Sequence, residues 1–384
     1  MRQRVLVLGS TGSVGTQSLQ VLEGLSESHE VVGLSAATSA AALSEQARAV
    51  RPRAVCLVDG AHARELVLPD GCRLFTGEEG LLALLAATEP DVVICAITGA
   101  AGLRSTLAAA EAGCRLALAN KESMVLAGHL VKAACRRSGA GIVPVDSEPS
   151  AIAQCLAGQD RGSVRRLILT ASGGPFRGRT LAELHDVTPA QALRHPSWEM
   201  GPRITIDSAT LMNKALEIVE ACQLFDVRPD QVEVVIHPQS VVHSLVEFTD
   251  GALLAQLSPP DMRLPIRYAL GGQARVPSGE EPVDLIALSG LTFERPDPES
   301  FPCLRFGDRV ARAGGLSGCI LNAANEVAVE AFLQHRLPFT AIAGVVDDAL
   351  SAFDNVPEPD LQMILQTDRR VRRHASAAIP QLAG

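Results

Sequence analysis

The order of apolar and polar residues over the first 145 positions predicts an α/β unit. Short apolar runs with the length of buried strands recur along this part, at 5–8, 31–35, 54–58, 91–96 and 115–119. Ala- and Leu-rich stretches with helical spacing separate the runs, so strand and helix alternate. Such alternation is typical of a parallel sheet covered by helices on both faces. We therefore predict a doubly wound, Rossmann-like sheet at the N-terminus.

The pattern divides the rest of the chain into a second α/β domain, a linker and a helical domain. Strand-like runs at 166–170, 233–236 and 241–248 predict a central α/β domain. A stretch rich in Pro, Gly and acids follows and is expected to be a linker. Ala-rich helical periodicity after it predicts a small C-terminal helical bundle. The expected divisions are 1–145, 146–270, 271–302 and 303–384.

The helix expected from Ser208 onward carries the densest set of polar groups. Its apolar stripe consists of Leu211, Ala215, Ile218 and Cys222. Asn213 and Lys214 precede Glu217 by four and three residues, so these side chains should be neighbours. Asp207 or Ser208 should cap the N-terminus, where the N–H groups and the helix dipole favour an anion such as phosphate. Two interpretations follow: a site for a phosphorylated substrate beside a divalent cation, or a solvated amphipathic helix with a Lys–Glu ion pair.

Two further acids, Asp146 and Glu148, follow the apolar run at 141–145. On an extended backbone they would point the same way and could share one cation. Pro149 suits the first turn of a helix, which places the pair at a strand-to-helix junction. With Glu217 as a third oxygen ligand, the set favours Mg²⁺ or Mn²⁺ over Zn²⁺. We predict an open metal site at Asp146, Glu148 and Glu217.

A glycine-rich turn, with Gly9, Gly12 and Gly15, connects the first predicted strand to a helix expected over 16–25. This is the context of a dinucleotide-binding turn. The second strand ends without an acid that could hold a ribose 2′-hydroxyl, so NADPH is favoured over NADH. No Arg or Lys stands there, so the 2′-phosphate would depend on hydroxyls and backbone N–H groups. The expected cofactor contacts are Thr11, Gly12, Ser13, Val14, Ala37, Thr38 and Ser39.

The segment 172–202 has the features of a mobile flap. Two glycines follow Ser172, and the chain returns through the proline-rich stretch that contains His195 and Trp198. The middle, 180–193, has weak helical patterning. Such a flap can exclude water from a bound substrate, and Trp198, the only tryptophan, would give it an apolar face. The alternative is that Trp198 belongs to the core.

Together, these segments resemble the 1-deoxy-D-xylulose 5-phosphate reductoisomerase family. The resemblance extends over nearly the whole chain and includes Gly-Ser-Thr-Gly-Ser-Val-Gly (9–15), Ala-Asn-Lys-Glu-Ser (119–123), Val-Asp-Ser-Glu-Pro-Ser (145–150), Thr-Ala-Ser-Gly-Gly-Pro-Phe-Arg (170–177), the run 195–217, Ile-His-Pro-Gln-Ser-Val-Val-His (236–243) and Leu-Asn-Ala-Ala-Asn-Glu-Val (321–327). No single motif is as specific as their combination in this order.

The resemblance implies an NADPH- and divalent-metal-dependent rearrangement and reduction of 1-deoxy-D-xylulose 5-phosphate to 2-C-methyl-D-erythritol 4-phosphate, on the route to isoprenoid precursors. It implies a homodimer. It assigns the substrate phosphate to Ser172, His195, Ser208, Asn213 and Lys214, with Trp198 closing over it, and the substrate hydroxyl and carbonyl groups to Lys121, Ser147 and Glu148. Further cofactor contacts would be Asn120, Glu122 and Gly201. The implied catalytic residues are Lys121, Asp146, Glu148, His195 and Glu217.

Composition limits the classes of partner and the cellular compartment that fit this chain. A formal net charge of −9 and 3% aromatic residues argue against a nucleic-acid partner. No apolar run approaches the roughly 20 residues that cross a bilayer, and Met1 leads almost directly into the first strand, which argues against a signal peptide. Nine scattered cysteines without a Cys-x-x-Cys pair indicate reduced thiols in the cytoplasm. A solvated helix face is expected for Arg369, Arg370, Arg372 and Arg373.

Two other functions remain open at this level. One is a plain NADP-dependent dehydrogenase of the semialdehyde or homoserine type, which would not need the three acids, so metal dependence separates it. The other is a catalytically silent nucleotide-binding or assembly protein. The polar residues at every expected ligand position argue against it.

Overall fold

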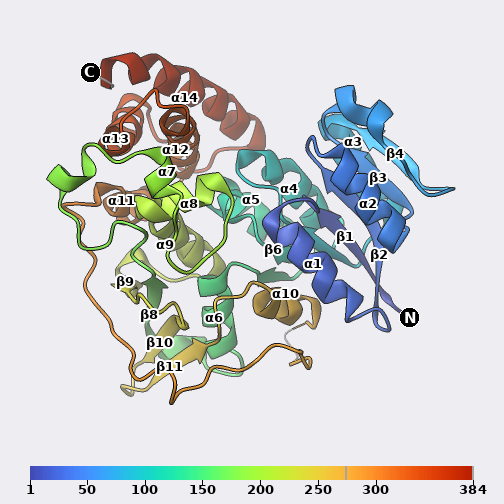
Figure 1. Ribbon diagram of the computed structural model, residues 1–384, viewed down its shortest axis with the longest axis horizontal. Coiled ribbons are helices and arrows are strands. Elements are labelled where there is room, and N and C mark those ends of the chain that lie inside the picture. The colour runs from blue at the N-terminus through green and yellow to red at the C-terminus, as the bar shows by residue number, and fades with distance from the viewer. Residues whose placement is uncertain (273–274, 383–384) are drawn as a thin grey trace. The chain divides into compact units, whose positions relative to one another are not determined.

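The computed structural model describes residues 1–272 and 275–382, and the chain divides into two compact units (Figure 1). The first unit comprises Met1–Ser123, Leu130–Ser150 and Asp261–Gly279. The second comprises Met124–His129, Ala151–Pro260 and Glu280–Gly384. Each unit is described by itself below.

A seven-stranded parallel sheet forms the centre of the first unit, in the order β4-β3-β2-β1-β5-β6-β7. The strands are β1 (Gln3–Leu8), β2 (His29–Ala36), β3 (Ala54–Leu57), β4 (Arg73–Thr76), β5 (Val92–Cys95), β6 (Arg115–Leu118) and β7 (Ile142–Pro144). The order reverses between β1 and β5. In open sheets of this kind, ligands bind at such a switch point, beyond the carboxyl ends of the strands.

The core of this sheet explains why the strands could be predicted. Val5, Val7, Leu34, Val55 and Ile94 are all fully buried, as expected for strands covered on both faces. The accompanying helices are α1 (Ser13–Glu23), α2 (Ala40–Val50), α3 (Gly77–Thr88), α4 (Leu103–Glu111), α5 (Lys121–Ser138) and α10 (Arg263–Leu270). The prediction of a Rossmann-like sheet is confirmed.

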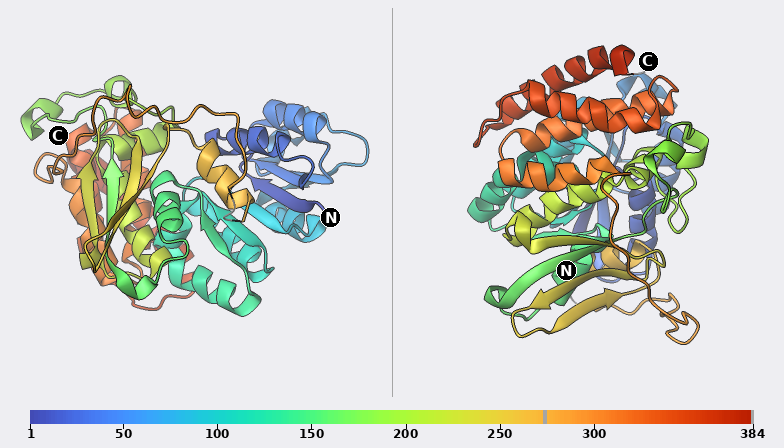
Figure 2. Two further views of the ribbon diagram at one scale, coloured as in Figure 1. Left: turned by 90° about the horizontal axis from the view of Figure 1, so that it is seen from below. Right: turned by 90° about the vertical axis from the view of Figure 1, so that its left-hand side faces the viewer.

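A four-stranded mixed sheet, in the order β11-β10-β8-β9, belongs to the second unit (Figure 2). Its strands are β8 (Val164–Ala171), β9 (Val232–Ile236), β10 (Val242–Phe248) and β11 (Leu253–Leu257). β8 pairs in parallel with β9 and antiparallel with β10, and β11 is an antiparallel edge strand. Hydrogen-bonded turns at Gly251 connect β10 to β11.

Helices make up most of the remainder of the second unit. They are α7 (Pro189–Ala192), α8 (Pro202–Ala209), α9 (Met212–Phe225), α11 (Arg305–Ala313), α12 (Ser317–Leu333), α13 (Ile342–Ala352) and α14 (Leu361–Leu382), while α6 (Ser147–Cys155) begins in the first unit and ends in the second. The orange and red helices α11 to α14 lie side by side (Figures 1 and 2). The helical C-terminal region is therefore confirmed, with Phe332, Ile364 and Val371 in its core.

Two local predictions were wrong. The helix expected from Ser208 is two helices: Pro202 occupies the first turn of α8, and Leu211, at a φ of 60°, separates α8 from α9. Ser208 therefore lies in the last turn of α8, and neither it nor Asp207 caps an N-terminus. Glu148 lies in the first turn of α6 rather than on extended backbone, so alternation does not relate it to Asp146.

The expected linker has little regular structure. Its described part, from 275 to 301, forms turns and an isolated bridge between Glu294 and Ile236. Residues 273–274 of the linker and 383–384 of the C-terminal segment lie outside the described residues. The four segment boundaries stay a prediction. Within the described ranges, none of the helices has both the length and the apolar character that a bilayer span requires.

Candidate active site

The glycine-rich turn between β1 and α1 brings backbone very close to backbone. Gly9 has a φ of +81°, and a Cβ there would lie 2.6 Å from the carbonyl oxygen of Ala96. A Cβ on Gly15 would lie 2.2 Å from the carbonyl oxygen of Gly9. Gly12 caps α1 without a side-chain hydrogen bond, so N–H groups of the first turn face the loop without a side-chain acceptor. N–H groups at the start of a helix can donate hydrogen bonds to phosphate oxygens.

The two predicted cofactor segments follow neighbouring strands. The residues from Thr11 to Val14 come after β1, and the exposed residues Ala37, Thr38 and Ser39 come after β2. A hydrogen bond from the N–H of Ser10 to the carbonyl of Ser35 (2.8 Å) connects the two strand ends. Because parallel strands end at the same edge, both segments lie at the carboxyl edge of the sheet.

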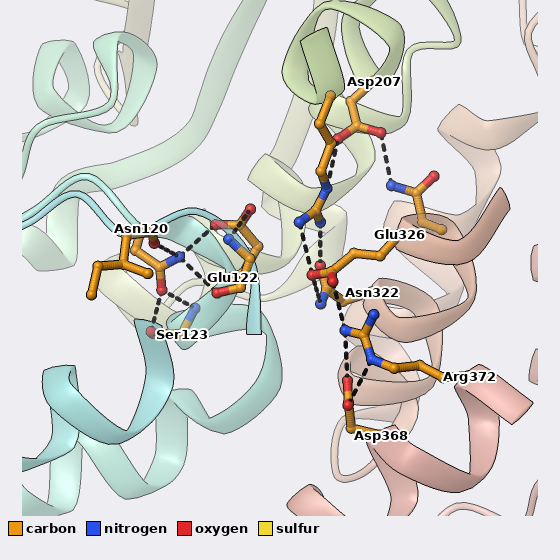
Figure 3. Close-up of polar contacts among 12 residues, drawn as sticks. Asn120, Glu122, Ser123, Asp207, Asn322, Glu326, Asp368 and Arg372 are labelled. Atoms are coloured by element: carbon orange, nitrogen blue, oxygen red, sulfur yellow. Dashed lines mark hydrogen bonds and ion pairs between the residues drawn. The ribbon is translucent and has the colours of Figure 1, made fainter. Parts of the chain in front are cut away.

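Asn120 fixes the turn that follows β6 (Figure 3). Its side chain accepts a hydrogen bond from the N–H of Ser123 (3.0 Å) and donates to the carbonyl of Ile97 (2.7 Å) and to Glu122 Oε2 (2.9 Å). Glu122 Oε1 accepts from the N–H of Gly99 (3.1 Å). Asn120 and Glu122 are both buried. They therefore rigidify the ends of β5 and β6 and the first turn of α5.

Lys121, in that first turn, makes an ion pair with Asp146, which follows the neighbouring strand β7. Asp146 Oδ1 accepts a hydrogen bond from the N–H of Ser147 (3.1 Å), and Ser147 Oγ donates to Glu148 Oε2 (2.6 Å). Lys121 is buried, and the two acids are half-buried. The structure thus brings these four predicted residues to one edge of the first unit's sheet.

In the second unit, His195 lies between two hydroxyl groups. Its Nε2 is 2.9 Å from Ser172 Oγ and 3.1 Å from Ser208 Oγ. Its Nδ1 accepts hydrogen bonds from the N–H groups of Ser197 (3.3 Å) and Trp198 (3.0 Å). An acceptor at Nδ1 places the proton of the neutral ring on Nε2. We call Ser172, His195 and Ser208 the His195 cluster.

Burial lowers the pKa of His195 to about 4. The ring is therefore neutral at pH 7, with one N–H directed at the two hydroxyls. A neutral donor together with hydroxyl groups suits a phosphate oxygen, because it supplies hydrogen bonds without needing a proton from solution.

α9 carries the predicted trio of Asn213, Lys214 and Glu217. Both Lys214 Nζ and Asn213 Nδ2 contact the Glu217 carboxylate, as the spacing predicts. The Glu217 side chain is fully buried and that of Lys214 is 4% exposed. A solvated amphipathic face is therefore excluded. Buried charges carry a large desolvation cost, and such groups concentrate at functional sites.

Trp198 is half-buried, so it is not a core residue. Its ring meets that of His243 edge to face, with centroids 6.0 Å apart. His243 Nε2 donates to the carbonyl oxygen of Ser258 (3.1 Å), and burial lowers the pKa of His243. His243 is buried, as a core histidine would be, and no spacing along the chain relates position 243 to position 198. Gly201 is the exposed N-cap of α8.

Three family profiles match consecutive parts of the chain. Residues 5–128 match 1-deoxy-D-xylulose 5-phosphate reductoisomerase, residues 142–225 match the 1-deoxy-D-xylulose 5-phosphate reductoisomerase C-terminal domain, and residues 257–374 match the DXP reductoisomerase C-terminal domain. A 1-deoxy-D-xylulose 5-phosphate reductoisomerase from Pseudomonas putida (strain W619) is 50% identical over 383 residues, which cover 96% of each chain. One from Symbiobacterium thermophilum is 50% identical over 379 residues, 97% of each chain.

Solved structures agree with these sequence matches. The enzyme of the same name from Zymomonas mobilis, in complex with NADPH, superposes with a TM-score of 0.93 at 39% identity and covers 100% of both chains. A DOX-P reductoisomerase in complex with NADPH, fosmidomycin and magnesium gives a TM-score of 0.93 at 40% identity and covers 99% of both chains.

Proposed function

The chain belongs to the 1-deoxy-D-xylulose 5-phosphate reductoisomerase family, and we propose here how its own residues carry out the reaction of that family. The reaction is the NADPH- and divalent-metal-dependent rearrangement and reduction of 1-deoxy-D-xylulose 5-phosphate to 2-C-methyl-D-erythritol 4-phosphate, a step toward isoprenoid precursors. The observation that carries this function is the match over almost the entire chain at half identity.

The glycine-rich turn is proposed to hold NADPH. The short distances at Gly9 and Gly15 support this role, because they leave the loop backbone bare for a pyrophosphate group. Bound NADPH supplies the hydride. The proposed contacts are Thr11, Gly12, Ser13 and Val14 for the pyrophosphate, Ala37, Thr38 and Ser39 for the 2′-phosphate, and Asn120, Glu122 and Gly201 for the rest of the cofactor.

Asp146, Glu148 and Glu217 are the proposed metal ligands. In support, Asp146 and Glu148 lie together in the first unit, and Glu217 is a fully buried carboxylate of the second. All ligands are hard carboxylate oxygens, which suit Mg²⁺ or Mn²⁺. A bound cation supplies Lewis acidity to adjacent substrate oxygens.

Two lysines balance the charge of this set. Lys121 pairs with Asp146, and Lys214 pairs with Glu217. They limit the repulsion among three carboxylates before a cation binds. Lys121, with Ser147 and Glu148, is proposed to orient the hydroxyl and carbonyl groups of the substrate.

The substrate phosphate is proposed to bind at the His195 cluster together with Asn213 and Lys214. His195 donates from Nε2, the two serines donate from their hydroxyls, and Lys214 adds the positive charge that a dianion requires. The protein as a whole carries a net charge of −9, so attraction of the phosphate has to be local.

Segment 172–202 is proposed to close over the bound phosphate, with Trp198 as its apolar face. The half-buried position of Trp198 supports this role. Since Trp198 is the only tryptophan, its emission should change when a phosphonate substrate analogue binds with Mg²⁺. Tight analogue binding without a change in emission or in proteolytic protection of the segment would show that it is a fixed loop.

A cytoplasmic homodimer is the proposed state of the enzyme. The edge strand β11 supports a second copy as partner, because Leu253 and Leu254 on it are exposed by 52% and 39%. All nine cysteines are free thiols, which fits a reducing compartment. The acidic net charge supports the absence of a nucleic-acid partner.

The direct test is an assay with purified protein, 1-deoxy-D-xylulose 5-phosphate, NADPH and Mg²⁺, in which the loss of nicotinamide absorbance is followed. We expect turnover that stops on addition of a chelator and returns with excess Mg²⁺ or Mn²⁺. Turnover that is unchanged by the chelator would contradict the metal assignment and favour a plain dehydrogenase.

A further inference from the structure

A network of charged and amide side chains connects α8 to α12 in the second unit (Figure 3). Arg203, in the first turn of α8, donates to Asn322 Oδ1 (3.0 Å) and pairs with Glu326 Oε1 (2.8 Å). One turn later, Asp207 Oδ1 accepts a hydrogen bond from Asn325 Nδ2 (2.7 Å). α12 therefore holds α8 at two successive turns.

The same network continues from α12 to α14. Glu326 Oε2 accepts from Arg372 Nη2 (2.6 Å), and Arg372 also makes two hydrogen bonds to Asp368, of 2.8 and 3.0 Å. The prediction of a solvated face is wrong for Arg372. It stays correct for Arg369, Arg370 and Arg373, which are exposed. We call Arg203, Asp207, Asn322, Asn325, Glu326, Asp368 and Arg372 the Glu326 network.

Glu326 is the shared centre of this network. Burial alone would raise its pKa, but the attraction of Arg203 and Arg372 outweighs burial and lowers the pKa. The carboxylate is thus ionised between two guanidinium groups. Buried ion pairs contribute little net stability because desolvation offsets their attraction. Their directional contacts instead fix one orientation of the helices that bear them.

α8 needs such external support. It has eight residues, and helices of that length are not stable on their own. Its last turn carries Ser208, which contacts His195. A Cβ on Gly174 would lie 2.9 Å from the carbonyl oxygen of Ser208, so the segment 172–202 packs tightly against this turn. A small rotation of α8 would therefore displace Ser208 from the His195 cluster.

We propose that Arg203 and Glu326 are positioning residues for the phosphate site, and that the C-terminal helices set the orientation of Ser208 through them. This inference rests on the proposed phosphate-binding role of the His195 cluster. The contacts given above connect these two residues to each other, to Asn322 of α12 and to Arg372 of α14. They act through the orientation of α8, and their loss should weaken the recognition of phosphate specifically.

Two variants test this role in the full-length enzyme. Glu326→Gln keeps the size of the side chain and removes the negative charge that pairs with Arg203. Arg203→Lys keeps the positive charge and removes the planar guanidinium group, which contacts both Asn322 and Glu326. We expect each to raise the Kd of a phosphonate substrate analogue and the KM for the substrate about tenfold, from the loss of one charge-assisted contact. NADPH affinity, measured by titration, should fall less than analogue affinity, because Gly201 alone among the proposed cofactor contacts lies on α8.

A matched control is Arg309→Met, which removes the ion pair with Asp347 between α11 and α13 in the same helical region. This exposed pair joins α11 to α13 rather than to α8, so analogue affinity should not change. Equal effects of Arg309→Met and Glu326→Gln on analogue affinity would overturn the proposal, because both would then act through general destabilisation.

A double-mutant cycle with Ser208→Ala separates positioning from a merely structural role. If Glu326 acts through Ser208, Glu326→Gln should weaken analogue binding by less than about threefold once Ser208 is removed. Independent, multiplicative effects would overturn the inference. Failure of the wild-type protein to bind the phosphonate analogue at all would instead contradict the proposed function, so the two failures are distinguishable.

Discussion

The glycine-rich turn of the first unit and the His195 cluster of the second unit are both proposed to bind phosphate groups, but they are built by different means. In the turn, the proposed binding groups belong to the backbone. Gly9 and Gly15 permit close contacts between backbone segments that a residue with a Cβ would prevent. In the cluster, side chains from positions 172, 195 and 208 meet, and the orientation of one helix decides whether they do. The first site is specified by neighbours in sequence, and the second depends on tertiary packing.

The largest loss of activity is expected from a change to a side chain of the proposed metal site. Glu217→Gln removes a fully buried carboxylate charge and one proposed metal ligand. We expect kcat to fall about 10²- to 10³-fold, because a group used in electrostatic stabilisation is lost. Steady-state kinetics with saturating Mg²⁺ and circular dichroism would measure activity and fold.

The control for Glu217→Gln is Glu111→Gln, at an exposed position of α4 in the first unit. Its kinetics should match those of the unmodified enzyme. Undiminished turnover in Glu217→Gln, with an intact fold, would remove Glu217 from the metal site.

The second-largest loss of activity is expected from Lys214→Ala. The loss of one charged hydrogen bond to the phosphate is worth about 1.5–3 kcal/mol, which is roughly ten- to over a hundredfold in kcat/KM. The same variant with a substrate that lacks the phosphate should lose little further activity. If Lys214→Ala and the unmodified enzyme discriminated equally between the two substrates, Lys214 would have no role at the phosphate.

Gly15→Ala tests the backbone-built site. A Cβ at 2.2 Å from the carbonyl oxygen of Gly9 forces the turn apart, so we expect a loss of about 1–3 kcal/mol in stability and weaker NADPH binding. Gly24→Ala, at the end of the same helix, is the matched control, since its Cβ would have 3.6 Å to the nearest atom. For each variant, urea unfolding measures the stability and NADPH titration measures the cofactor affinity. Identical behaviour of the two variants would refute the argument from close approach.

The smallest effect concerns pH. The pKa of His195 is about 4 in the folded protein against an ordinary value of 6.5, so the folded state disfavours the charged ring. Stability is thus retained above pH 6.5 and falls as the pH drops toward 4, by up to about 2 kcal/mol at pH 5. His195→Asn should lose that part of the pH dependence. Urea unfolding at pH 7.5 and 5 measures it, and equal pH dependence in both proteins would contradict the assigned burial.

The contrast between local sequence patterns and tertiary packing also explains which features could be predicted from sequence. The strands β1, β2, β3, β5 and β6 could be predicted, because burial on both faces produces continuous apolar runs. β4 could not, because Arg73, Leu74 and Thr76 at the sheet edge are exposed, and neither could the exposed edge strand β11. The motifs indicated the family, since each is a local pattern, and they supplied the candidate site residues.

What could not be predicted depends on contacts between distant positions. No local pattern marks Leu211 as left-handed, and that residue divides the expected helix in two. Arg372 differs from its exposed neighbours only because Glu326 and Asp368 lie next to it. Likewise, the contact of His243 with Trp198 joins residues on a strand and in the flap segment. Spacing along the chain carries no signal for such pairs.

The most direct test of the central claim is identification of the product. The protein would be incubated with carbon-13-labelled 1-deoxy-D-xylulose 5-phosphate, NADPH and Mg²⁺, and the carbon skeleton would be followed by NMR. The account predicts one branched 2-C-methyl-D-erythritol 4-phosphate formed for each NADPH oxidised. NADPH oxidation that yields a reduced sugar with an unbranched skeleton would contradict it, because that is the result expected of a plain dehydrogenase.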